Sequence, residues 1–537
     1  MRQQLGRQTA ILVPALLVAL ACSGTTTVGG ASGTDAGSDA GAGSETDAGA
    51  DAGAGADAGA DAGADAGADA GADAGADAGA DAGAGVDAGA PPLDGGLPGV
   101  VDGGFAACVW SQPVVLSTAL GASTEQAVAV DPFGNAMAVR RPNATFQGVW
   151  MNRYSFDTDR WDDAGMISDA GENGVNPTVA FDLQGNALVI WEETASNEGH
   201  ARQFISSASA WGPVTRFNPS PSPSKPIGAF DLAVLVQGDP VALWEEAFSG
   251  VNSVWANRFR ADAGIWDDAG VISQDAGSAF FPRVTRLANG DLVAIWMQVE
   301  GARCNAWSNR FDTVTGLWND AGLIENDSTA TSGSCVGSIG LSADALGNAF
   351  AVFPLESGTR FDFWANRYRG STGLWETAAA IETDDLIASF PQVGAAAVEA
   401  DLFGNAFAVW QQKTDAGTTV KNSIFVNLYD FGAGRWGDAG LLESDDGFDA
   451  VGPQVVTDQA GNAIVLWSQK ATGGTQTKIF ERRFIRSLGS WTSAAVVDSD
   501  AGNSTVPRLA RHPSGLAVAV WQQLVSGQFH AVAAVCR

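Results

Sequence analysis

From about residue 105 onward, apolar and polar residues alternate in short runs that are separated by turn-forming residues. A period of two is typical of β-strands, because successive side chains of a strand point to opposite faces of the sheet. The runs recur in larger units, and each unit contains the turn motif Asp-x-x-Gly-Asn-Ala followed by an apolar run. The motif is complete at Asp131–Ala136, Asp182–Ala187, Asp344–Ala349, Asp401–Ala406 and Asp458–Ala463, and degenerate around Gly238, Gly290 and Gly515.

The motif glycines define the length of the repeat. They occupy positions 134, 185, 238, 290, 347, 404, 461 and 515, so successive copies are 51 to 57 residues apart. Each copy contains four expected strands, exemplified in chain order by Pro177–Asp182, Ala187–Trp191, Trp255–Phe259 and Trp266–Ile272. Four strands in about 50 residues are typical of a β-propeller blade. Eight copies therefore predict an all-β fold, an eight-bladed propeller of four-stranded blades over residues 105–537.

The tryptophans support this division into strands. All 18 fall on three of the four expected strands, and because indoles bury a large apolar area, we expect them to pack between blades. The fourth strand has Trp110, Trp161, Trp211, Trp266, Trp318, Trp375, Trp436 and Trp491; the second has Trp191, Trp244, Trp296, Trp410, Trp467 and Trp521; the third has Trp150, Trp255, Trp307 and Trp364.

The strand types at the two ends of the repeat region predict how the ring closes. The first expected strand, Trp110–Leu116, is of the fourth type, and the last, Phe529–Cys536, is of the third type. The first strand would therefore complete the last blade, a closure that leaves few free edges. Cys108 and Cys536 would meet there, and we expect them to form a disulfide that replaces a missing hairpin.

The two other cysteines of the repeat region, Cys304 and Cys335, belong to connections that would emerge on the same face of the ring, so we expect a second disulfide between them. No Cys-x-x-Cys pair is present, which argues against a zinc site. Two disulfides would imply an oxidising compartment.

Residues 1–21 have the features of a signal peptide, with Arg2 and Arg7 before a short apolar run, Ile11–Leu20. The sequence Ala19-Leu20-Ala21-Cys22 resembles the lipobox of bacterial lipoproteins, which implies lipidation of Cys22. Under that family's sorting rule, Ser23 implies the outer membrane or the cell surface. Ala19 and Ala21 also suit ordinary signal peptidase, which would release a secreted protein.

Residues 22–104 are of low complexity, and Asp57–Asp81 is nearly pure Asp-Ala-Gly-Ala. A helix would place like charges four residues apart, and the segment offers no large side chains to bury. We therefore expect a disordered linker, either a stalk that lifts the propeller from a membrane or a tract that is merely tolerated.

The formal net charge of −32 argues against nucleic-acid binding, which requires a basic surface. We expect membrane contact only through the N-terminal lipid, and a monomer. The three histidines, His200, His512 and His530, fall in different strand contexts, and no nucleophile elbow, phosphate loop or metalloprotease motif is present. No catalytic residue, cofactor or metal site is expected.

The turn motif resembles the Asp-box of sialidase-type propellers but lacks its Ser-x-Asp-x-Gly-x-Thr-Trp pattern, so no sialidase residue is carried over. Two further positions recur around the ring, which suggests shared hydrogen bonding rather than a site. One holds Arg153, Arg258, Arg310 and Arg367, and the other Glu192, Glu245, Gln411 and Gln522.

The connections after the second and fourth strands are longer and more variable than the other turns, as in Glu192–Gln203, Phe217–Pro226, Asn326–Gly337 and Gln411–Asn422. Binding usually resides in variable loops on a rigid scaffold, so we assign any ligand to this face, which includes Lys225, Lys413 and Lys421. We expect a binding scaffold for an unknown protein or polysaccharide. A polysaccharide hydrolase or lyase with carboxylates at the tunnel mouth, and a structural envelope component, are the alternatives.

Overall fold

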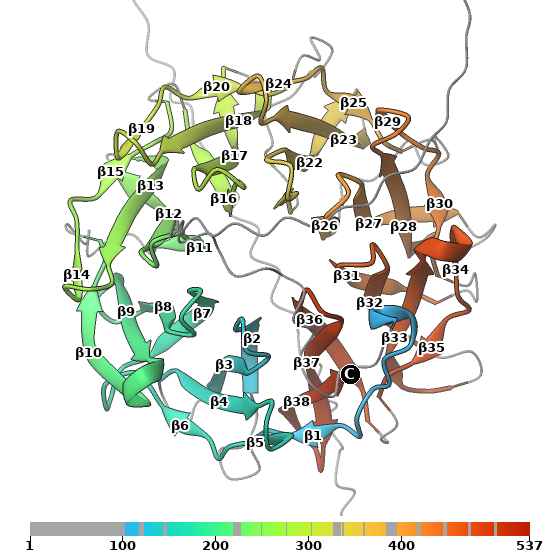
Figure 1. Cartoon of the computed structure of the whole chain (residues 1–537), viewed down its shortest axis with the longest axis horizontal. Coiled ribbons are helices and arrows are strands. Elements are labelled where there is room, and N and C mark those ends of the chain that lie inside the picture. Colours follow the sequence, from blue (N-terminus) through green and yellow to red (C-terminus); the bar gives the residue numbers. More distant parts are fainter. Residues whose placement is uncertain are drawn as a thin grey trace, which may run out of the picture. The chain divides into compact units, whose positions relative to one another are not determined.

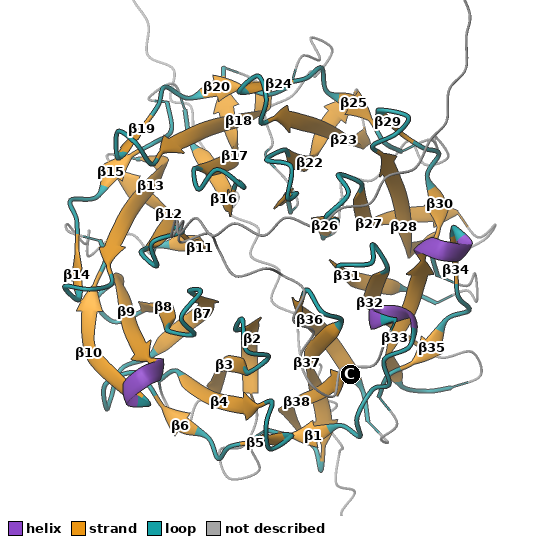
Figure 2. Ribbon diagram, viewed as in Figure 1, coloured by secondary structure: helices purple, strands orange, loops and turns teal. Residues whose placement is uncertain are grey.

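The computed structural model describes residues 103–116, 123–142, 148–218, 227–248, 250–274, 277–301, 303–325, 335, 338–357, 360–382, 395–415, 420–443, 448–470, 474–498 and 502–537. These residues form eight antiparallel sheets arranged as a ring (Figure 1), so the predicted eight-bladed propeller is confirmed. Strands dominate the described part (Figure 2), which also contains three 3-10 helices, η1 (Gly104–Ala106), η2 (Ser206–Ala208) and η3 (Arg486–Leu488). Within these residues we find no helix with the length and hydropathy of a membrane span.

We number the blades 1 to 8 along the chain and name their strands a to d from the axis outward. Blade 1 contains β2 (Ser123–Val130), β3 (Ala136–Pro142), β4 (Trp150–Ser155), β5 (Arg160–Trp161) and β6 (Gly165–Met166). Blade 2 contains β7 (Gly174–Phe181), β8 (Ala187–Glu193), β9 (Glu198–Ile205) and β10 (Ala210–Arg216). Blade 3 contains β11 (Gly228–Val234), β12 (Pro240–Phe248), β13 (Val251–Arg260), β14 (Ile265–Trp266) and β15 (Gly270–Val271). Blade 4 contains β16 (Ala279–Arg286), β17 (Leu292–Glu300), β18 (Arg303–Asp312), β19 (Leu317–Trp318) and β20 (Gly322–Leu323).

The second half of the ring repeats this order. Blade 5 contains β21 (Gly340–Ala343), β22 (Ala349–Ser357), β23 (Arg360–Arg369), β24 (Leu374–Trp375) and β25 (Ala379–Ala380). Blade 6 contains β26 (Ala396–Ala400), β27 (Ala406–Asp415), β28 (Val420–Asp430), β29 (Arg435–Trp436) and β30 (Gly440–Leu441). Blade 7 contains β31 (Ala450–Thr457), β32 (Ala463–Lys470), β33 (Thr477–Ile485), β34 (Ser490–Trp491) and β35 (Ala495–Val496). Blade 8 contains β36 (Ser504–His512), β37 (Leu516–Val525), β38 (Gln528–Cys536) and, from the other end of the repeat region, β1 (Val114–Val115).

The outermost strand differs from the expectation in six blades, where it is divided into two strands of two residues that both pair with strand c. In blade 1, β5 and β6 replace the continuous strand Trp161–Ile167. Between these two strands a side chain replaces a backbone hydrogen bond to strand c, since Asn152 Nδ2 donates to the carbonyl oxygen of Asp162 at 2.6 Å.

The six tryptophans of strand b are fully buried, and they pack against the preceding blade, as Trp191 does against Met137 and Val139. The prediction that indoles pack between blades is therefore confirmed for this strand. In five blades the indole N–H also donates to the Gln or Glu two residues later, as from Trp467 Nε1 to Gln469 Oε1 at 2.9 Å. The side chain thus combines apolar burial with a satisfied polar group.

The ring closes as the strand types predict. β1 pairs with β38, with Val114 opposite Ala533, and Cys108 is bonded to Cys536 (Sγ–Sγ 2.06 Å). The N-terminal end is also fixed to blade 7, where Phe105 N donates to an oxygen of Asp458 at 2.7 Å. The second disulfide joins Cys304 to Cys335. Both pairs are those expected from the topology, and they indicate folding in an oxidising environment, periplasmic or extracellular.

The Asp-x-x-Gly-Asn motif forms the turn between strands a and b. Asp131 Oδ1 accepts the amides of Phe133 and Asn135 at 2.8 Å, and Asn135 Nδ2 donates to Oδ2 at 2.9 Å. The other complete copies make the same bonds, and all eight motif glycines have positive φ, the region that favours glycine. The motif is therefore structural.

Candidate functional site at the start of the inner strands

The inner strands share a distortion near their first residues. In six blades, strand a contains a β-bulge, a local register shift against strand b. The bulged residues all have positive φ: Glu125 (52°), Asn176 (51°), Ala229 (28°), Phe281 (58°), Gly452 (66°) and Val506 (54°). Left-handed conformations of non-glycine residues cost about 1–3 kcal/mol each and cluster at functional sites, as bulges do. Their recurrence at one level marks this end of the ring as the candidate site.

Polar side chains of strand b stabilise these bulges. Glu245 Oε1 accepts the amide of Phe281 in the next blade at 2.5 Å, and Gln411 Oε1 accepts the amide of Gly452 at 3.3 Å. Gln522 Nε2 donates to Gln126 Oε1 at 3.2 Å, from blade 8 to blade 1. The hydrogen bonding predicted for this recurring position is therefore confirmed, and it links neighbouring blades.

Blade 1 departs from blades 2 and 3 at this level. Arg140 and Arg141 stand where blades 2 and 3 have Trp-Glu, and Arg141 faces Glu125 (Nη1–Oε1 3.2 Å). Arg141 Nη2 donates to Asn173 Oδ1 at 3.3 Å, and Glu125 Oε2 accepts the amide of Asn176 at 2.8 Å. Together with Glu192, these residues form what we call the Glu125 cluster: Glu125, Arg141, Asn173, Asn176 and Glu192.

Two carboxyl groups of the Glu125 cluster lie in contrasting surroundings. Burial raises the pKa of Glu192 to about 7, a hydrogen bond from the Asn176 side chain opposes the shift, and the charges of Glu125 and Glu193 add to it. Glu125 instead accepts hydrogen bonds from Arg141 and the Asn176 amide, and about a third of its side chain is exposed. A carboxyl with a raised pKa beside a second carboxyl, as Glu192 is here, is able to serve as a general acid.

Glu245 in blade 3 occupies the same position as Glu192. Burial raises its pKa to about 7 as well, opposed by the amide of Phe281 and the charge of Arg283. Sequence reasoning noted the recurrence of this position but missed the bulges and the contrast between Glu192 and Glu125. The Pro that follows four of the bulged residues, as in Asn176-Pro177 and Val506-Pro507, was the available signal.

The expected long loops are only partly loops. Glu192–Gln203 and Gln411–Asn422 lie mainly in extended hairpins, β8–β9 and β27–β28, because both strands continue beyond the blade. Lys421 in β28 is buried, with its Nζ 3.3 Å from Glu443 Oε1, so its expected role on a binding surface is wrong. Lys413 lies in β27. Lys225 and Cys22 lie outside the described residues, as do residues 1–102 with the expected signal peptide and linker.

The recurring strand-c arginines make hydrogen bonds and ring contacts within and between blades. Arg258 Nε donates to Asp239 at 2.9 Å, and Arg310 Nη2 lies 2.5 Å from Asp291. Arg153 stacks on Phe204 of blade 2, 5.1 Å from the ring centroid, and Arg367 Nη1 donates to the Tyr429 hydroxyl at 3.1 Å. These contacts confirm a shared structural role.

The histidines lie apart, as their strand contexts predict. His200 lies between Glu172 and Glu198, with Nδ1 2.8 Å and Nε2 3.1 Å from their carboxylate oxygens. His512 Nε2 contacts the carbonyl oxygen of Pro132 at 3.0 Å, and His530 is buried in β38. Within the described ranges, no three His, Cys, Asp or Glu side chains are arranged to hold a metal ion.

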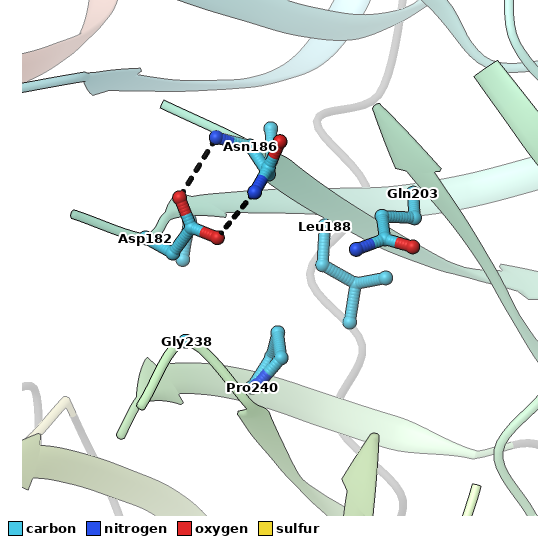
Figure 3. Close-up of a pocket in the computed structure, with 8 residues that line it drawn as sticks. Asp182, Asn186, Leu188, Gln203, Gly238 and Pro240 are labelled. Atoms are coloured by element: carbon cyan, nitrogen blue, oxygen red, sulfur yellow. Dashed lines mark hydrogen bonds between the residues drawn. The ribbon is translucent and has the colours of Figure 1, made fainter. Parts of the chain in front are cut away.

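A small hollow of about 180 Å³, open to solvent, lies between the a–b turns of blades 2 and 3 (Figure 3). Asp182, Asn186, Gln203 and Pro240 are among its lining residues. Both carboxylate oxygens of Asp182 are used inside its own turn, by the backbone amide and the side chain of Asn186 at 2.8 and 2.7 Å. We therefore interpret this hollow as a gap between blades and not as a site.

No family model and no curated relative match the sequence. Among solved structures, the Dos1 propeller is 10% identical and covers 81% of this chain and 96% of its own, with a TM-score of 0.48. The polysaccharide lyase Uly1 is 10% identical over 79% of this chain and 90% of its own (TM-score 0.39). A Penicillium chrysogenum α-L-arabinanase, solved with arabinobiose, is 13% identical over 57% and 92% (TM-score 0.36). At such identities the likeness concerns the fold alone.

Proposed function

We propose that this chain is an exported propeller that binds a polysaccharide at the Glu125 cluster. The observation that carries the proposal is the break in the repeat there: Arg141 of β3 stands where blades 2, 3, 6 and 8 have Glu or Gln, and it contacts Glu125 and Asn173 beside a strained bulge. A binding site is expected to break the internal symmetry, whereas residues that only hold blades together recur around the ring.

The chemistry of the cluster suits sugar hydroxyls. Glu125 and Arg141 are each about one-third exposed, and Asn176 is exposed, so a carboxylate, a guanidinium and an amide all reach solvent on one face. Convergent polar groups of this kind fix the orientation of a ligand. The backbone amide of Asn176, at the bulge, donates a hydrogen bond to the Glu125 carboxylate. This bond holds Asn176 in position, so the site is preorganised.

A glycan array with the full-length chain tests the proposal. We expect binding to at least one polysaccharide, reduced at least tenfold by Glu125→Gln and by Arg141→Gln. Asp163→Asn, an exposed carboxylate between β5 and β6, is the matched control and leaves binding unchanged. Wild-type affinity in both cluster variants would refute the assignment.

A second candidate, a polysaccharide hydrolase or lyase, is favoured by the raised pKa of Glu192 next to Glu125. Glycoside hydrolases use two carboxyl groups, one of which is a general acid with a raised pKa. Release of reducing ends or unsaturated products from a bound polysaccharide, abolished by Glu192→Gln with binding retained, would establish the enzyme. Binding of a polysaccharide without release of products would favour the binding scaffold over the enzyme.

We also propose that Cys22 carries a lipid that anchors the propeller outside the cytoplasm. The disulfides support export, and the resemblance to the lipobox supports the lipid. Mass spectrometry of the mature N-terminus tests it. A diacylated Cys22 is the expected result, and cleavage at another position or an unmodified Cys22 overturns it.

A further inference from the structure

Two inner strands carry the same basic motif. Pro282–Arg286 in β16 and Pro507–Arg511 in β36 both have the pattern Pro-Arg-x-x-Arg, with the proline directly after the bulged residue. The registers are equivalent, because Arg283 and Arg508 each pair with the residue before the strand-b tryptophan. No other described inner strand has this pattern.

The two motifs lie on opposite sides of the ring. The inner strands are neighbours in the order β2, β7, β11, β16, β21, β26, β31 and β36, and β36 adjoins β2 (Figure 1). β16 and β36 are therefore four blades apart in either direction. Because their registers match, Arg283 and Arg508 lie at the same level of the two inner strands. We call these two residues the axial arginines.

A contact between distant blades shows that an arginine side chain of β36 reaches across the middle of the ring. Arg511 lies against Glu399 of β26, two blades away, with Nη2 2.8 Å from Oε1. Arg508 is exposed but surrounded by protein, which lowers its pKa, and the charge of Arg283 lowers it further. Because Arg283 belongs to the opposite blade, the charge that acts on Arg508 comes from across the ring.

Within the described residues, the hydrogen bonds of Arg283 and Arg508 go to backbone carbonyl oxygens. Each donates from Nη1 to the carbonyl oxygen of the preceding proline, at 3.1 and 3.3 Å. Among the described residues neither makes an ion pair, in contrast to Arg258, Arg310 and Arg511.

The carboxyls nearest to Arg283 compensate its charge only in part. The charge of Arg283 acts on Asp231 and Glu245, yet burial raises the pKa of both groups, to about 7 for Glu245. Within the described residues, a chain of net charge −32 therefore carries two inner-strand arginines that make no ion pair. Guanidinium groups bind carboxylates and sulfates through paired hydrogen bonds, so the position is suited to an anionic ligand.

We propose that Arg283 and Arg508 bind the acidic groups of an anionic polysaccharide, carboxylated or sulfated, from opposite sides of the axis. The proposal rests on the proposed function and specifies its ligand class: the Glu125 cluster would contact hydroxyls while the axial arginines select charge. Because the contact is electrostatic, affinity falls with salt.

The test is a titration of the full-length chain with polygalacturonate and alginate (carboxylated), dextran sulfate and chondroitin sulfate (sulfated), and dextran and arabinan (neutral), at 50 and 500 mM NaCl. We expect at least tenfold preference for acidic over neutral glycans at low salt. The Arg283→Gln/Arg508→Gln double variant loses that preference, and Arg283→Lys/Arg508→Lys retains part of it. Arg160→Gln, an exposed arginine in β5, is the matched control and behaves as wild type. Unfolding midpoints confirm that the variants fold.

The outcomes separate this inference from the proposed function. Binding of neutral glycans that depends on Glu125, without preference for acidic ones, overturns the axial site and keeps the binding function. Absence of binding to any glycan overturns both. The segment Asp57–Asp81 is itself rich in acidic residues, so the titration is repeated with its aspartates changed to Asn. If acidic glycans also fail to bind this variant, competition by the aspartates does not explain the missing binding. That result overturns the axial site.

Discussion

Asn309 Nδ2 in strand c of blade 4 donates to the carbonyl oxygen of Ile272 in blade 3 at 3.1 Å. The bond joins the outer parts of two neighbouring blades, which no ladder of backbone hydrogen bonds connects. Blades 3, 5 and 6 use Asn257, Asn366 and Asn427 in the same way, while blades 2 and 7 use Arg202 and Arg482. Strand c therefore carries a recurring polar link between blades.

We expect Asn309→Ala to lower the free energy of unfolding by about 1–2 kcal/mol, because the carbonyl of Ile272 loses its donor in a buried position. Asn319→Ala, an exposed asparagine of the same blade, serves as the control and has an effect near zero. Urea unfolding of both variants measures the difference. Equal stabilities would show that the link contributes nothing.

The indole hydrogen bond of strand b is testable by a matched pair of substitutions. Trp467 and Trp191 are both fully buried, but Trp191 Nε1 has no hydrogen-bond partner among the described residues, whereas Trp467 Nε1 donates to Gln469. Both Trp→Phe variants lose similar apolar contact. We expect Trp467→Phe to cost about 1–2 kcal/mol more than Trp191→Phe in chemical unfolding, because only it breaks a bond. A larger loss in Trp191→Phe would contradict this explanation.

The two disulfides close loops of very different length, with sequence separations of 428 and 31 residues. The loss of loop-closure entropy predicts that Cys108→Ser/Cys536→Ser destabilises the fold by about 2 kcal/mol more than Cys304→Ser/Cys335→Ser. Urea unfolding of the two double variants, with wild type unfolded under reducing conditions for comparison, gives both values. If removing the Cys304–Cys335 disulfide lowers the free energy of unfolding by as much, ring closure depends on the pairing of β1 with β38 and not on the Cys108–Cys536 bond.

Glu245 connects stability to pH. Its pKa is raised from 4.5 to about 7 in the folded chain, so the folded state binds more protons than the unfolded state between these values. The contribution of protonated Glu245 to the stability of the fold is fully present below pH 4.5 and is lost as the pH rises through 7. We expect Glu245→Gln, which retains an acceptor for the Phe281 amide, to match wild type at pH 4 and to be about 1–3 kcal/mol more stable at pH 8. A variant less stable than wild type at pH 8 would show that the ionised carboxylate, beside Arg283, stabilises the fold.

The repeat made most of the fold predictable. Local signals, a turn motif around Gly134 and its seven equivalents and tryptophans at fixed positions, recur with enough regularity to specify blades and strand order. The break in strand d was not predictable, because it depends on Asn152 reaching the carbonyl of Asp162 across an already formed sheet. The extent of the β27–β28 hairpin was also missed, since residues such as Lys413 and Lys421 suggest a loop until their pairing is seen.

The site was less accessible to sequence reasoning. Glu192 and Glu245 were noted as recurring, but their pKa values depend on how deeply the assembled ring buries them. The role of Arg141 was not predicted for a similar reason, because its contact with Glu125 in the neighbouring strand depends on the bulge that shifts the register between β2 and β3.

The sequence by itself determined the number of blades, the closure of the ring and the cysteine pairs, because each follows from the order of repeated local units. Only the tertiary structure decided which charges meet. Arg283 and Arg508 are more than two hundred residues apart, and nothing local relates them. Their strands lie opposite each other because an eight-membered ring places its fourth and eighth members on opposite sides of one axis.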